Sequence, residues 1–309
     1  MKTVIIGAGG VGGYFGGKLT KAGYDTSFLV RSKTLEAIQS NGLQVKSILG
    51  DFHVYPTATD SYDIIKKADL VILSVKSWQI EGIAHKIKTL LKPDAMVLPL
   101  QNGADNANRL AEILRSDQIL AGLCRIVAKI ESPGIIDHFG YEPEILFGEM
   151  DNSKSERVAK IHEIFTKSGF KNNISSDIQR DIWLKFLFIS SISAMGALTR
   201  SVLGVMREDV FIREKLLKTA EEVVSVGIAL GVQIGNDDIK NCFKIIDAID
   251  YNTTMSLQRD MMEAKPSELE NFNGYIVRQG DKLGIDTPVN DFIYYSLRPM
   301  EEKVRRVRR

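Results

Sequence analysis

The sequence predicts an α/β protein in which an N-terminal, doubly wound parallel sheet is followed by a C-terminal all-helical domain. Through the first half, short β-branched runs alternate with helical patterns of about 10 to 15 residues, which is typical of βαβ units around a parallel sheet. After residue 176 no convincing strand remains, and the pattern is helical nearly to the end. We therefore expect one domain at residues 1–175 and a second at residues 176–309.

The first half begins with strands that are each followed by a helix. The strands are expected at residues 2–6, 25–30, 68–75 and 95–100, and the helices near 11–22, 33–41, 78–91 and 104–114. The near-continuous apolarity of "LVILSV" at residues 70–75 indicates a strand that is covered on both faces.

The alternation of strand and helix patterns ends at about residue 118. Three apolar segments follow in quick succession and are expected to be antiparallel strands added to the same sheet, at residues 119–130, 134–140 and 144–150. A helix near 155–169 and a short segment at 172–176 then close this half. In the second half, helix breaks are expected near Gly235, Pro266 and Pro288.

Composition and charge exclude several classes of protein. The 309 residues carry a formal net charge of +1, so no global field draws the chain toward nucleic acid or a membrane surface.

Cys124 and Cys242 lack metal-ligand or CxxC spacing and fit reduced, buried thiols of a cytoplasmic protein. The four histidines show no metal-ligand spacing either. The apolar run at 186–198 is shorter than the roughly 20 residues of a membrane span, and the first residues predict a strand rather than a signal peptide. The basic run at 303–309 is typical of a solvated chain end, with a basic contact patch as the alternative.

The stretch "VIIGAGGVGGYFGGKL" at residues 4–19 contains seven glycines. Gly7, Gly9 and Gly12 form a G-x-G-x-x-G pattern directly after a strand and at the start of a helix, where they permit a tight turn, close approach of a pyrophosphate and close helix–strand packing. The helix N-terminus adds free N–H groups and the positive end of its dipole. We expect a Rossmann-like dinucleotide site, with a purely structural turn as the alternative, and its residues are Gly7, Ala8, Gly9, Gly10, Val11 and Gly12. The remaining glycines, Gly13, Gly16 and Gly17, are expected to let the helix pack closely.

The end of the second strand indicates which dinucleotide binds. A site for NAD usually places Asp or Glu about 20 residues beyond the glycine motif, where the carboxylate binds the ribose 2′-hydroxyl. This chain has Arg31, Ser32 and Lys33 there and no acid. Two cations and a hydroxyl suit a 2′-phosphate, so we expect NADP, although the cations are also compatible with an ordinary helix start.

Polar residues follow two further strands. Lys76 and Gln79 come after the strand at 68–75, and Asn102 comes after the strand at 95–100. Ligands of a doubly wound sheet bind at the carboxyl ends of its strands, so these side chains are expected to face the cofactor. Each is also compatible with a turn, and Asn102–Gly103 especially is turn chemistry.

The helical half contributes a lysine and a glutamate. Lys185 is the only charged residue between Asp181 and Arg200, on a helix that is apolar almost all round and is therefore expected to be buried. Burial lowers the pKa of a lysine toward neutrality, which makes it a competent proton donor, whereas a lysine whose stem merely covers apolar surface is the alternative. Glu268 lies between Ser267 and Glu270, whose spacing predicts a capping box at a helix start, so a functional and a capping role are both open.

These motifs, taken in order, resemble the ketopantoate reductase family from residue 1 to about residue 300. The resemblance rests on "GAGGVGGYFG", "VKSWQ", "LQNG", W-x-K on an apolar helix, "SELENFNG" and "LGIDTPVN". It implies NADPH-dependent reduction of 2-dehydropantoate to pantoate in pantothenate biosynthesis, in a cleft between a Rossmann domain and a helical domain. Under this resemblance Lys185 is the catalytic acid and Glu268 its partner carboxylate, which also contacts the cofactor. The other implied contacts are Asn102 with cofactor and substrate, Ser256 with substrate, and Lys76 and Gln79 near the nicotinamide. The expected contact of Arg31 with the 2′-phosphate rests on the end of the second strand alone.

The chain departs from the family at two positions. The family commonly carries asparagines at the fourth and eighth positions after the catalytic lysine, and this chain has Ile189 and Ser193 there. Ser193 keeps a hydroxyl for the substrate, but Ile189 makes part of the pocket apolar, which leaves another branched 2-oxoacid open as the substrate. Two other classes remain: a two-domain NAD(P) dehydrogenase for hydroxyacyl, opine or sugar-phosphate substrates, and a non-catalytic NADP-binding regulator. A small-molecule 2-oxoacid and a homodimeric assembly are the expected partners, without nucleic acid or membrane.

Overall fold

The computed structural model describes residues 1–307, with the side chains described through residue 306. The chain forms two compact units, which we call unit 1 (residues 1–178) and unit 2 (residues 179–309). The boundary expected after residue 175 lies after Ile178.

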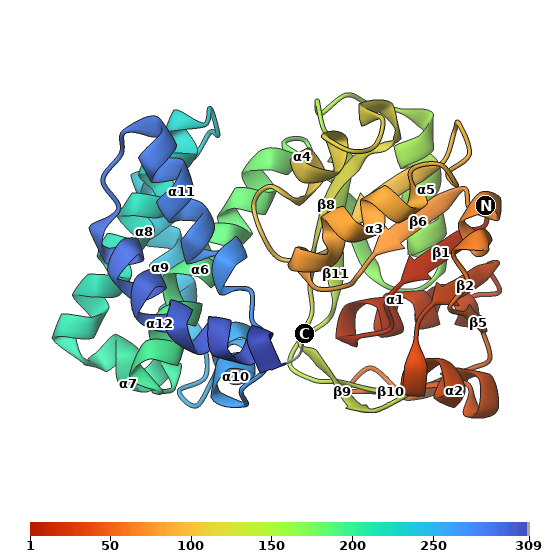
Figure 1. Ribbon diagram of the computed structural model, residues 1–309, viewed down its shortest axis with the longest axis horizontal. Helices are drawn as coiled ribbons and strands as arrows, with labels where there is room; N and C mark the ends of the chain where they lie inside the picture. Colours follow the sequence, from red (N-terminus) through yellow and green to blue (C-terminus); the bar gives the residue numbers. More distant parts are fainter. Residues whose placement is uncertain (308–309) are drawn as a thin grey trace. The chain divides into compact units, whose positions relative to one another are not determined.

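The centre of unit 1 is a five-stranded, entirely parallel sheet (Figure 1). Its strands in spatial order are β5 (Thr57–Thr59), β2 (Thr26–Leu29), β1 (Thr3–Ile6), β6 (Leu70–Leu73) and β7 (Met96–Pro99). Helices α1 (Gly10–Lys21), α2 (Ser32–Asn41) and α3 (Ile80–Ile87) lie between these strands in the chain, and α4 (Asn106–Ala111) follows β7. Strand order therefore runs outward from β1 in both directions, which confirms the doubly wound sheet.

The strands after residue 118 belong to two further sheets, one of which also contains two earlier strands. One is four-stranded and contains β4 (Phe52–Val54), β3 (Leu43–Ser47), β10 (Ile135–His138) and β9 (Ala128–Ser132). The other is three-stranded and contains β12 (Lys171–Ile174), β11 (Glu144–Glu149) and β8 (Leu120–Arg125), next to helix α5 (Glu156–Lys167). The expectation of antiparallel additions to the central sheet was wrong, because the β3–β4 hairpin offers β10 a parallel edge and only an isolated bridge, Val97 to Ile119, reaches the central sheet.

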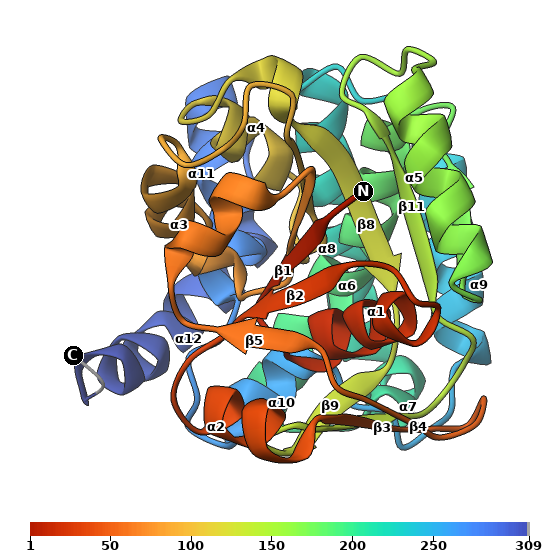
Figure 2. The same ribbon diagram turned by 90° about the vertical axis from the view of Figure 1, so that its right-hand side faces the viewer.

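Helix α1 lies between the five-stranded and the four-stranded sheet, and this position explains its glycines (Figure 2). A Cβ on Gly16 would come within 2.5 Å of Phe28 on β2, whereas a Cβ on Gly13 would come within 2.6 Å of Ile136 on β10. Gly17 faces Phe52 of β4. Close packing on two faces thus compensates for the roughly 1 kcal/mol that each glycine costs in a helix, and the expected packing role of these glycines is confirmed.

Unit 2 is helical throughout the part of the chain that the structure describes (Figure 1). Its elements are α6 (Ile178–Thr199), α7 (Leu203–Glu208), α8 (Val210–Ala229), α9 (Asn236–Ala248), α10 (Ser256–Met262), the 3₁₀ turn η4 (Leu269–Asn271), α11 (Asn273–Leu283) and α12 (Pro288–Val307). The three expected breaks each fall between two of these elements. The buried carboxylate of Glu222 in α8 accepts hydrogen bonds of 2.9 Å from the N–H groups of Val289 and Asn290, which caps the start of α12.

Helix α6 is the apolar helix that the sequence predicts. It is long and apolar enough to span a membrane, but 72% of its most apolar window is buried inside the protein, as in the core helix of a globular domain. The buried hydroxyls of Ser190, Ser191 and Ser193 donate to carbonyl oxygens four residues earlier. The hydroxyl donors of these serines are therefore satisfied within the helix.

Candidate functional site

The carboxyl ends of four central strands are in register. Ile6 of β1 is paired with Leu29 of β2 and with Leu73 of β6, and Leu73 is paired with Pro99 of β7. The segments that follow these residues therefore begin at one edge of the sheet, and β1 and β6 flank the point where strand order reverses. We call this the C-terminal edge; it is where ligands bind in doubly wound sheets. It carries the predicted site residues of unit 1.

The glycine turn directly after β1 has the geometry expected of a phosphate-binding turn. Gly7 has φ +96°, which an L-residue rarely adopts, and a Cβ on Gly12 would lie 2.1 Å from both the Gly7 carbonyl oxygen and the Ser74 hydroxyl. Gly9 caps α1 without a capping side chain, no acidic residue lies in the first turn, and a Cβ on Gly9 would meet nothing within 4 Å. The turn thus leaves the first helix N–H groups without a side-chain cap, and the space beside Gly9 is open. Ala8 is buried, whereas Gly10 and Val11 are half-buried beside it.

Two cations follow β2 at the same edge. Arg31 and Lys33 are exposed on either side of the start of α2, and neither forms an ion pair with another described residue. No carboxylate occupies the end of this strand. Their positive charge remains available to an anion.

The loop after β6 is ordered by local hydrogen bonds. The Ser74 hydroxyl donates to the Gly7 carbonyl over 2.8 Å and also contacts the Ile6 carbonyl at 3.1 Å, so it fixes the glycine turn. Gln79 accepts a 3.3 Å hydrogen bond from the Lys76 N–H through its side-chain oxygen, and the Lys76 ammonium lies 5.8 Å from the centre of the Trp78 ring. Gln79 therefore shapes the loop that carries Lys76.

In the loop after β7, the side chain of Asn106 fixes the backbone of Asn102. The buried Asn106 amide donates to the carbonyl oxygens of Gln101 and Asn102 at 3.0 and 3.2 Å. Asn102 itself is half-buried at the C-terminal edge. Beside it, the Gln101 side chain is 7% exposed, and neither its oxygen nor its nitrogen has a hydrogen-bond partner within the described residues. Buried amides rarely remain unpaired, so Gln101 is an exception at this edge of the sheet.

In unit 2, aromatic packing joins the segments that carry Lys185 and Glu268. Lys185 is half-buried on α6, next to Phe186. The Phe186 ring packs edge-on against Phe272, with 6.2 Å between ring centres, and Phe272 ends the η4 turn that Glu268 begins. The Glu268 side chain is 5% exposed. The lysine and the carboxylate thus come from two segments that pack on each other.

The two positions where the chain departs from the family pattern also lie on α6. Ile189 is 7% exposed, and its carbonyl oxygen accepts the hydroxyl hydrogen of Ser193. Ser193 thus has its donor engaged by the helix and retains only lone pairs for another partner. Ser256, by contrast, is exposed at the first position of α10.

The sequence predicts a capping box between Ser267 and Glu270, and this prediction was wrong about the partner of Ser267. The Ser267 hydroxyl accepts from the Leu269 N–H at 3.3 Å, while the Glu270 carboxylate turns outward to Arg278 and the Tyr294 hydroxyl. The Ser267 N–H instead donates to Glu301 of α12. The acceptor comes from a helix far along the chain, so no local spacing could reveal it.

The C-terminal basic run is solvated only in part. Lys303 and Arg306 are exposed, but the Arg305 side chain is 31% exposed and forms a 2.6 Å ion pair with Glu301. Arg308 and Arg309 lie outside the described residues. The expectation of a simple solvated end is therefore wrong for Arg305.

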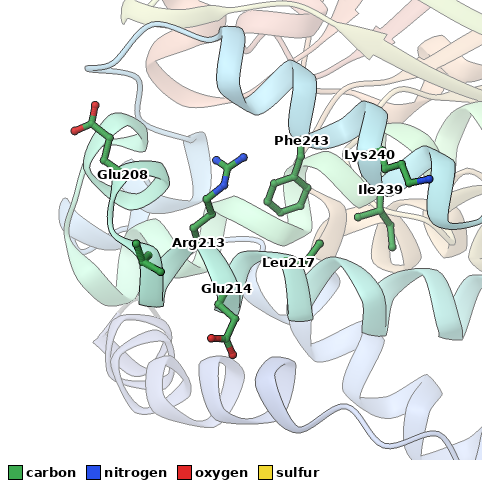
Figure 3. Close-up of a pocket in the computed structure, with 8 residues that line it drawn as sticks. Glu208, Arg213, Glu214, Leu217, Ile239, Lys240 and Phe243 are labelled. Carbon is green, nitrogen blue, oxygen red and sulfur yellow. The ribbon is translucent and has the colours of Figure 1, made fainter.

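Unit 2 also contains a hollow of about 520 Å³ between α8 and α9 (Figure 3). Its apolar lining is Val210, Leu217, Ile239 and Phe243, and charged side chains such as Arg213 surround it. None of the predicted site residues lines it. Among the described residues, no group of three or more histidine, cysteine, aspartate or glutamate side chains is placed to hold a metal ion.

Two family models match this chain. The model described as "Ketopantoate reductase PanE/ApbA" matches residues 3–152, and its C-terminal counterpart matches residues 177–301. The chain belongs to the ketopantoate reductase family. It is accordingly an oxidoreductase of the kind that acts on CH–OH groups.

Similar proteins agree with this family along the whole chain. An uncharacterized oxidoreductase of Bacillus subtilis, YkpB, is 28% identical over 301 residues, which cover 97% of this chain and 99% of the relative. The crystal structure of a PanE/ApbA family ketopantoate reductase from Ralstonia eutropha superposes with a TM-score of 0.91 at 29% identity and covers 99% of this chain and 100% of that one. A D-mandelate dehydrogenase in complex with NADH and anilino(oxo)acetate has a TM-score of 0.90 at 22% identity, with 99% of each chain covered, and shows the shared fold.

The sequence analysis missed four residues that hold the predicted ones in place. These are Ser74 behind the glycine turn, Asn106 behind Asn102, and Glu301 with Arg305 behind Ser267. "DNAN" after "LQNG" offered a signal for Asn106, because an asparagine soon after a turn often bonds back to its backbone. The others act across more than 30 residues and left no local pattern.

Proposed function

We propose that the protein is an NADPH-dependent 2-oxoacid reductase and that its substrate is 2-dehydropantoate, which it reduces to pantoate. The observation that carries the proposal is the open glycine turn at the C-terminal edge, in a chain that matches both halves of the ketopantoate reductase family. In this proposal unit 1 binds the dinucleotide and unit 2 supplies the proton donor and substrate contacts.

The residues at the C-terminal edge fit a dinucleotide. The uncapped start of α1 and the open space at Gly9 suit a pyrophosphate, since N–H groups and a positive dipole end favour an anion there. Asn102, Lys76 and Gln79, which follow β7 and β6 at the same edge, suit the nicotinamide half.

The preference for NADPH over NADH rests on the two exposed cations. Arg31 and Lys33 would bind the 2′-phosphate, and no carboxylate replaces them to bind a 2′-hydroxyl. NADH is the competing cofactor, because a structural neighbour was solved with it.

The chemistry divides between the cofactor and the chain. Bound NADPH supplies a hydride to the keto carbon of the substrate. The Lys185 ammonium stabilises the negative charge that develops on the carbonyl oxygen and donates the proton that completes the alcohol. Glu268 orients the lysine or the substrate hydroxyl, while Asn102, Ser256 and Ser193 hold the substrate's polar groups. The Ser193 contact would be through its oxygen, since its hydrogen is engaged by Ile189.

A different 2-oxoacid is the second candidate substrate, and Ile189 favours it. Its apolar side chain replaces an amide that commonly contacts substrate in the family. A less polar branched or aromatic 2-oxoacid does not need the hydrogen bond that this amide would supply. The neighbour solved as D-mandelate dehydrogenase illustrates that this fold accommodates such chemistry. Two further functions compete with these reductases: a dehydrogenase for hydroxyacyl, opine or sugar-phosphate substrates, and a non-catalytic NADP-binding regulator.

A panel of 2-oxoacids, including 2-dehydropantoate, tests the proposal when each is assayed by oxidation of NADPH and of NADH. Turnover of 2-dehydropantoate supports the proposed substrate, and turnover of another 2-oxoacid supports the second candidate. Binding of NADPH without turnover of any of them would support the regulator instead.

Lys185→Met tests the proposed acid. The substitution keeps the apolar stem but removes the ammonium, so it separates packing from proton transfer. We expect kcat to fall by a factor of about 10² or more with NADPH affinity nearly unchanged. A folded Met variant with normal turnover would refute Lys185 as the proton donor.

We further propose a cytoplasmic homodimer that binds neither nucleic acid nor membrane. Exposed apolar side chains on unit 2 support self-association: Val210 is 84% and Phe211 68% exposed on α8, and Phe292 is 66% exposed on α12. Light scattering at several concentrations tests the assembly, and a monomer throughout would contradict it.

A further inference from the structure

Ser267, the residue before Glu268, is held by two charged side chains of α12. Its N–H donates to both carboxylate oxygens of Glu301 at 3.0 and 3.1 Å, and its hydroxyl donates to one of them at 2.7 Å. Arg305 forms a 2.6 Å ion pair with Glu301 and donates over 3.0 Å to the Ser267 carbonyl. We call these contacts the Ser267 clamp. Ser267 is fully buried, and Glu301 is 6% exposed.

We propose that Glu301 and Arg305 are positioning residues that act on the reaction through Glu268. The inference rests on the proposed function, in which the Glu268 carboxylate orients the lysine or the substrate. Nothing in the chemistry of the reaction requires Glu301 or Arg305 to touch the substrate.

The clamp fixes the backbone on the N-terminal side of Glu268. The carbonyl that Arg305 binds belongs to the peptide that links Ser267 to Glu268, so the plane of that peptide is set directly. On the other side, the Glu268 carbonyl accepts from the N–H groups of Asn271 and Phe272 at 3.0 Å each. A backbone held on both sides leaves the direction of the Glu268 side chain little freedom.

The segment before the clamp is attached to the end of α10, where the Lys265 N–H donates to the Asp260 carbonyl over 2.7 Å, but it is exposed. Residues 262–265 are exposed, and Ala264 has φ +50°, an uncommon conformation for alanine. Pro266 has no N–H with which to anchor the segment. The hydrogen bonds at Ser267 are therefore the attachment nearest to Glu268 on its N-terminal side.

The contacts of the Ser267 clamp suit the orientation of the backbone at Ser267 rather than the transfer of a proton. The Glu301 oxygens accept from one N–H, one hydroxyl and the Arg305 guanidinium, which are charge-assisted contacts and stronger than neutral ones. Both oxygens are engaged, so Glu301 is suited to hold Ser267 and not to act on a substrate. Errors of about 1 Å in the placement of a reacting group can lower a rate about 10²-fold, so a loosened clamp should be visible in turnover.

Glu301→Gln is the test variant, and Glu302→Gln is its matched control. Glu302 is the next residue on the same helix, but its carboxylate faces Arg298 and Arg306 on the exposed side and does not reach Ser267. We expect Glu301→Gln to lower kcat about tenfold or more with NADPH affinity unchanged, and Glu302→Gln to leave both as in wild type. Hydrogen exchange of residues 267–272 should accelerate in Glu301→Gln alone.

A double-variant cycle separates positioning from general stability. If Glu301 acts through Glu268, adding Glu301→Gln to Glu268→Gln should change kcat by less than about twofold. A purely structural defect would instead multiply with the loss from Glu268→Gln. Should Glu301→Gln fail to fold, Arg305→Lys keeps the charge but removes the second arm to the Ser267 carbonyl, and the same cycle applies with a smaller single-variant loss.

The outcomes distinguish the positioning role from the proposed function. If Glu268→Gln is impaired while Glu301→Gln and Arg305→Lys turn over normally, or if the cycle is multiplicative, the positioning role is overturned and the proposed function stands. If Glu268→Gln is itself fully active, the proposed role of Glu268 fails and the positioning inference falls with it.

Discussion

Two glycines of the dinucleotide turn should respond to alanine in opposite ways. A Cβ on Gly12 would lie 2.1 Å from the Gly7 carbonyl oxygen and 2.1 Å from the Ser74 hydroxyl, and the hydroxyl is held by two backbone carbonyls. A Cβ on Gly9 would meet nothing within 4 Å, and its φ of −78° suits alanine. Gly12→Ala therefore strains the protein itself, whereas Gly9→Ala obstructs only what binds in front of the turn.

The expected free energies follow from these contacts. Overpacking costs about 1–3 kcal/mol and the loss of a Ser74 hydrogen bond about 1 kcal/mol, while alanine returns up to about 1 kcal/mol of helix propensity. Gly12→Ala should thus lower the free energy of unfolding by about 2 kcal/mol, or Tm by about 4–8 °C for a domain of this size. Gly9→Ala should cost below about 1 kcal/mol, because alanine is a slightly poorer helix cap. It should raise the Kd for NADPH about tenfold or more, equivalent to about 1.4 kcal/mol.

Thermal unfolding of each variant, with and without NADPH, together with calorimetric titration, measures both effects. Gly9→Ala should melt near wild type yet lose most of the stabilisation by NADPH. The reasoning is refuted if Gly9→Ala binds NADPH with wild-type affinity, or if Gly12→Ala melts at the wild-type temperature.

Three further outcomes are expected. NADPH should bind at least about tenfold more tightly than NADH, and Arg31→Ala should remove most of that preference; equal affinities in wild type would contradict the assignment. Ile189→Asn should raise kcat/KM for 2-dehydropantoate if the present pocket prefers a less polar substrate, and a wild-type kcat near 10 per second on 2-dehydropantoate would make that preference untenable. Burial by itself raises the pKa of Glu149, but hydrogen bonds from Arg157 and Ser155 outweigh it and hold this pKa below its ordinary value. The Glu149 carboxylate therefore stabilises the fold above about pH 4.5 and loses this effect as the pH falls through the folded pKa, so Glu149→Gln should flatten the acid limb of a urea-unfolding series; an unchanged limb would argue against it.

The parts of the fold that local patterns encode were predictable from the sequence. The strand, glycine turn and helix at residues 3–21 are adjacent in the chain, and their apolar and glycine spacing reports the structure directly. The apolar surroundings of Lys185 likewise predicted a core helix, and α6 is one.

The rest depends on pairings between distant segments. Strand β10 pairs with β3, about 90 residues earlier, and nothing in "GIIDHFG" distinguishes that edge from the central sheet. Ser267 and Glu270 have the spacing of a capping box, yet Glu301 of α12 accepts from the Ser267 N–H while Glu270 accepts from the Tyr294 hydroxyl. The catalytic roles of Lys185 and Glu268 remain predictions, because residue type and burial do not by themselves assign a chemical role.

The packing of α1 between two sheets has a consequence for how the chain matures during synthesis. The helix follows the first strand, but Gly10 and Gly13 are covered by Ala128 and Ile136, which leave the ribosome more than 110 residues later. Until then one face of a glycine-rich helix, a poor helix on its own, lacks its cover. A nascent chain that ends before β10 should therefore not retain dinucleotide, although it already contains the entire glycine motif, and capacity to bind should appear abruptly once the second sheet closes over the helix.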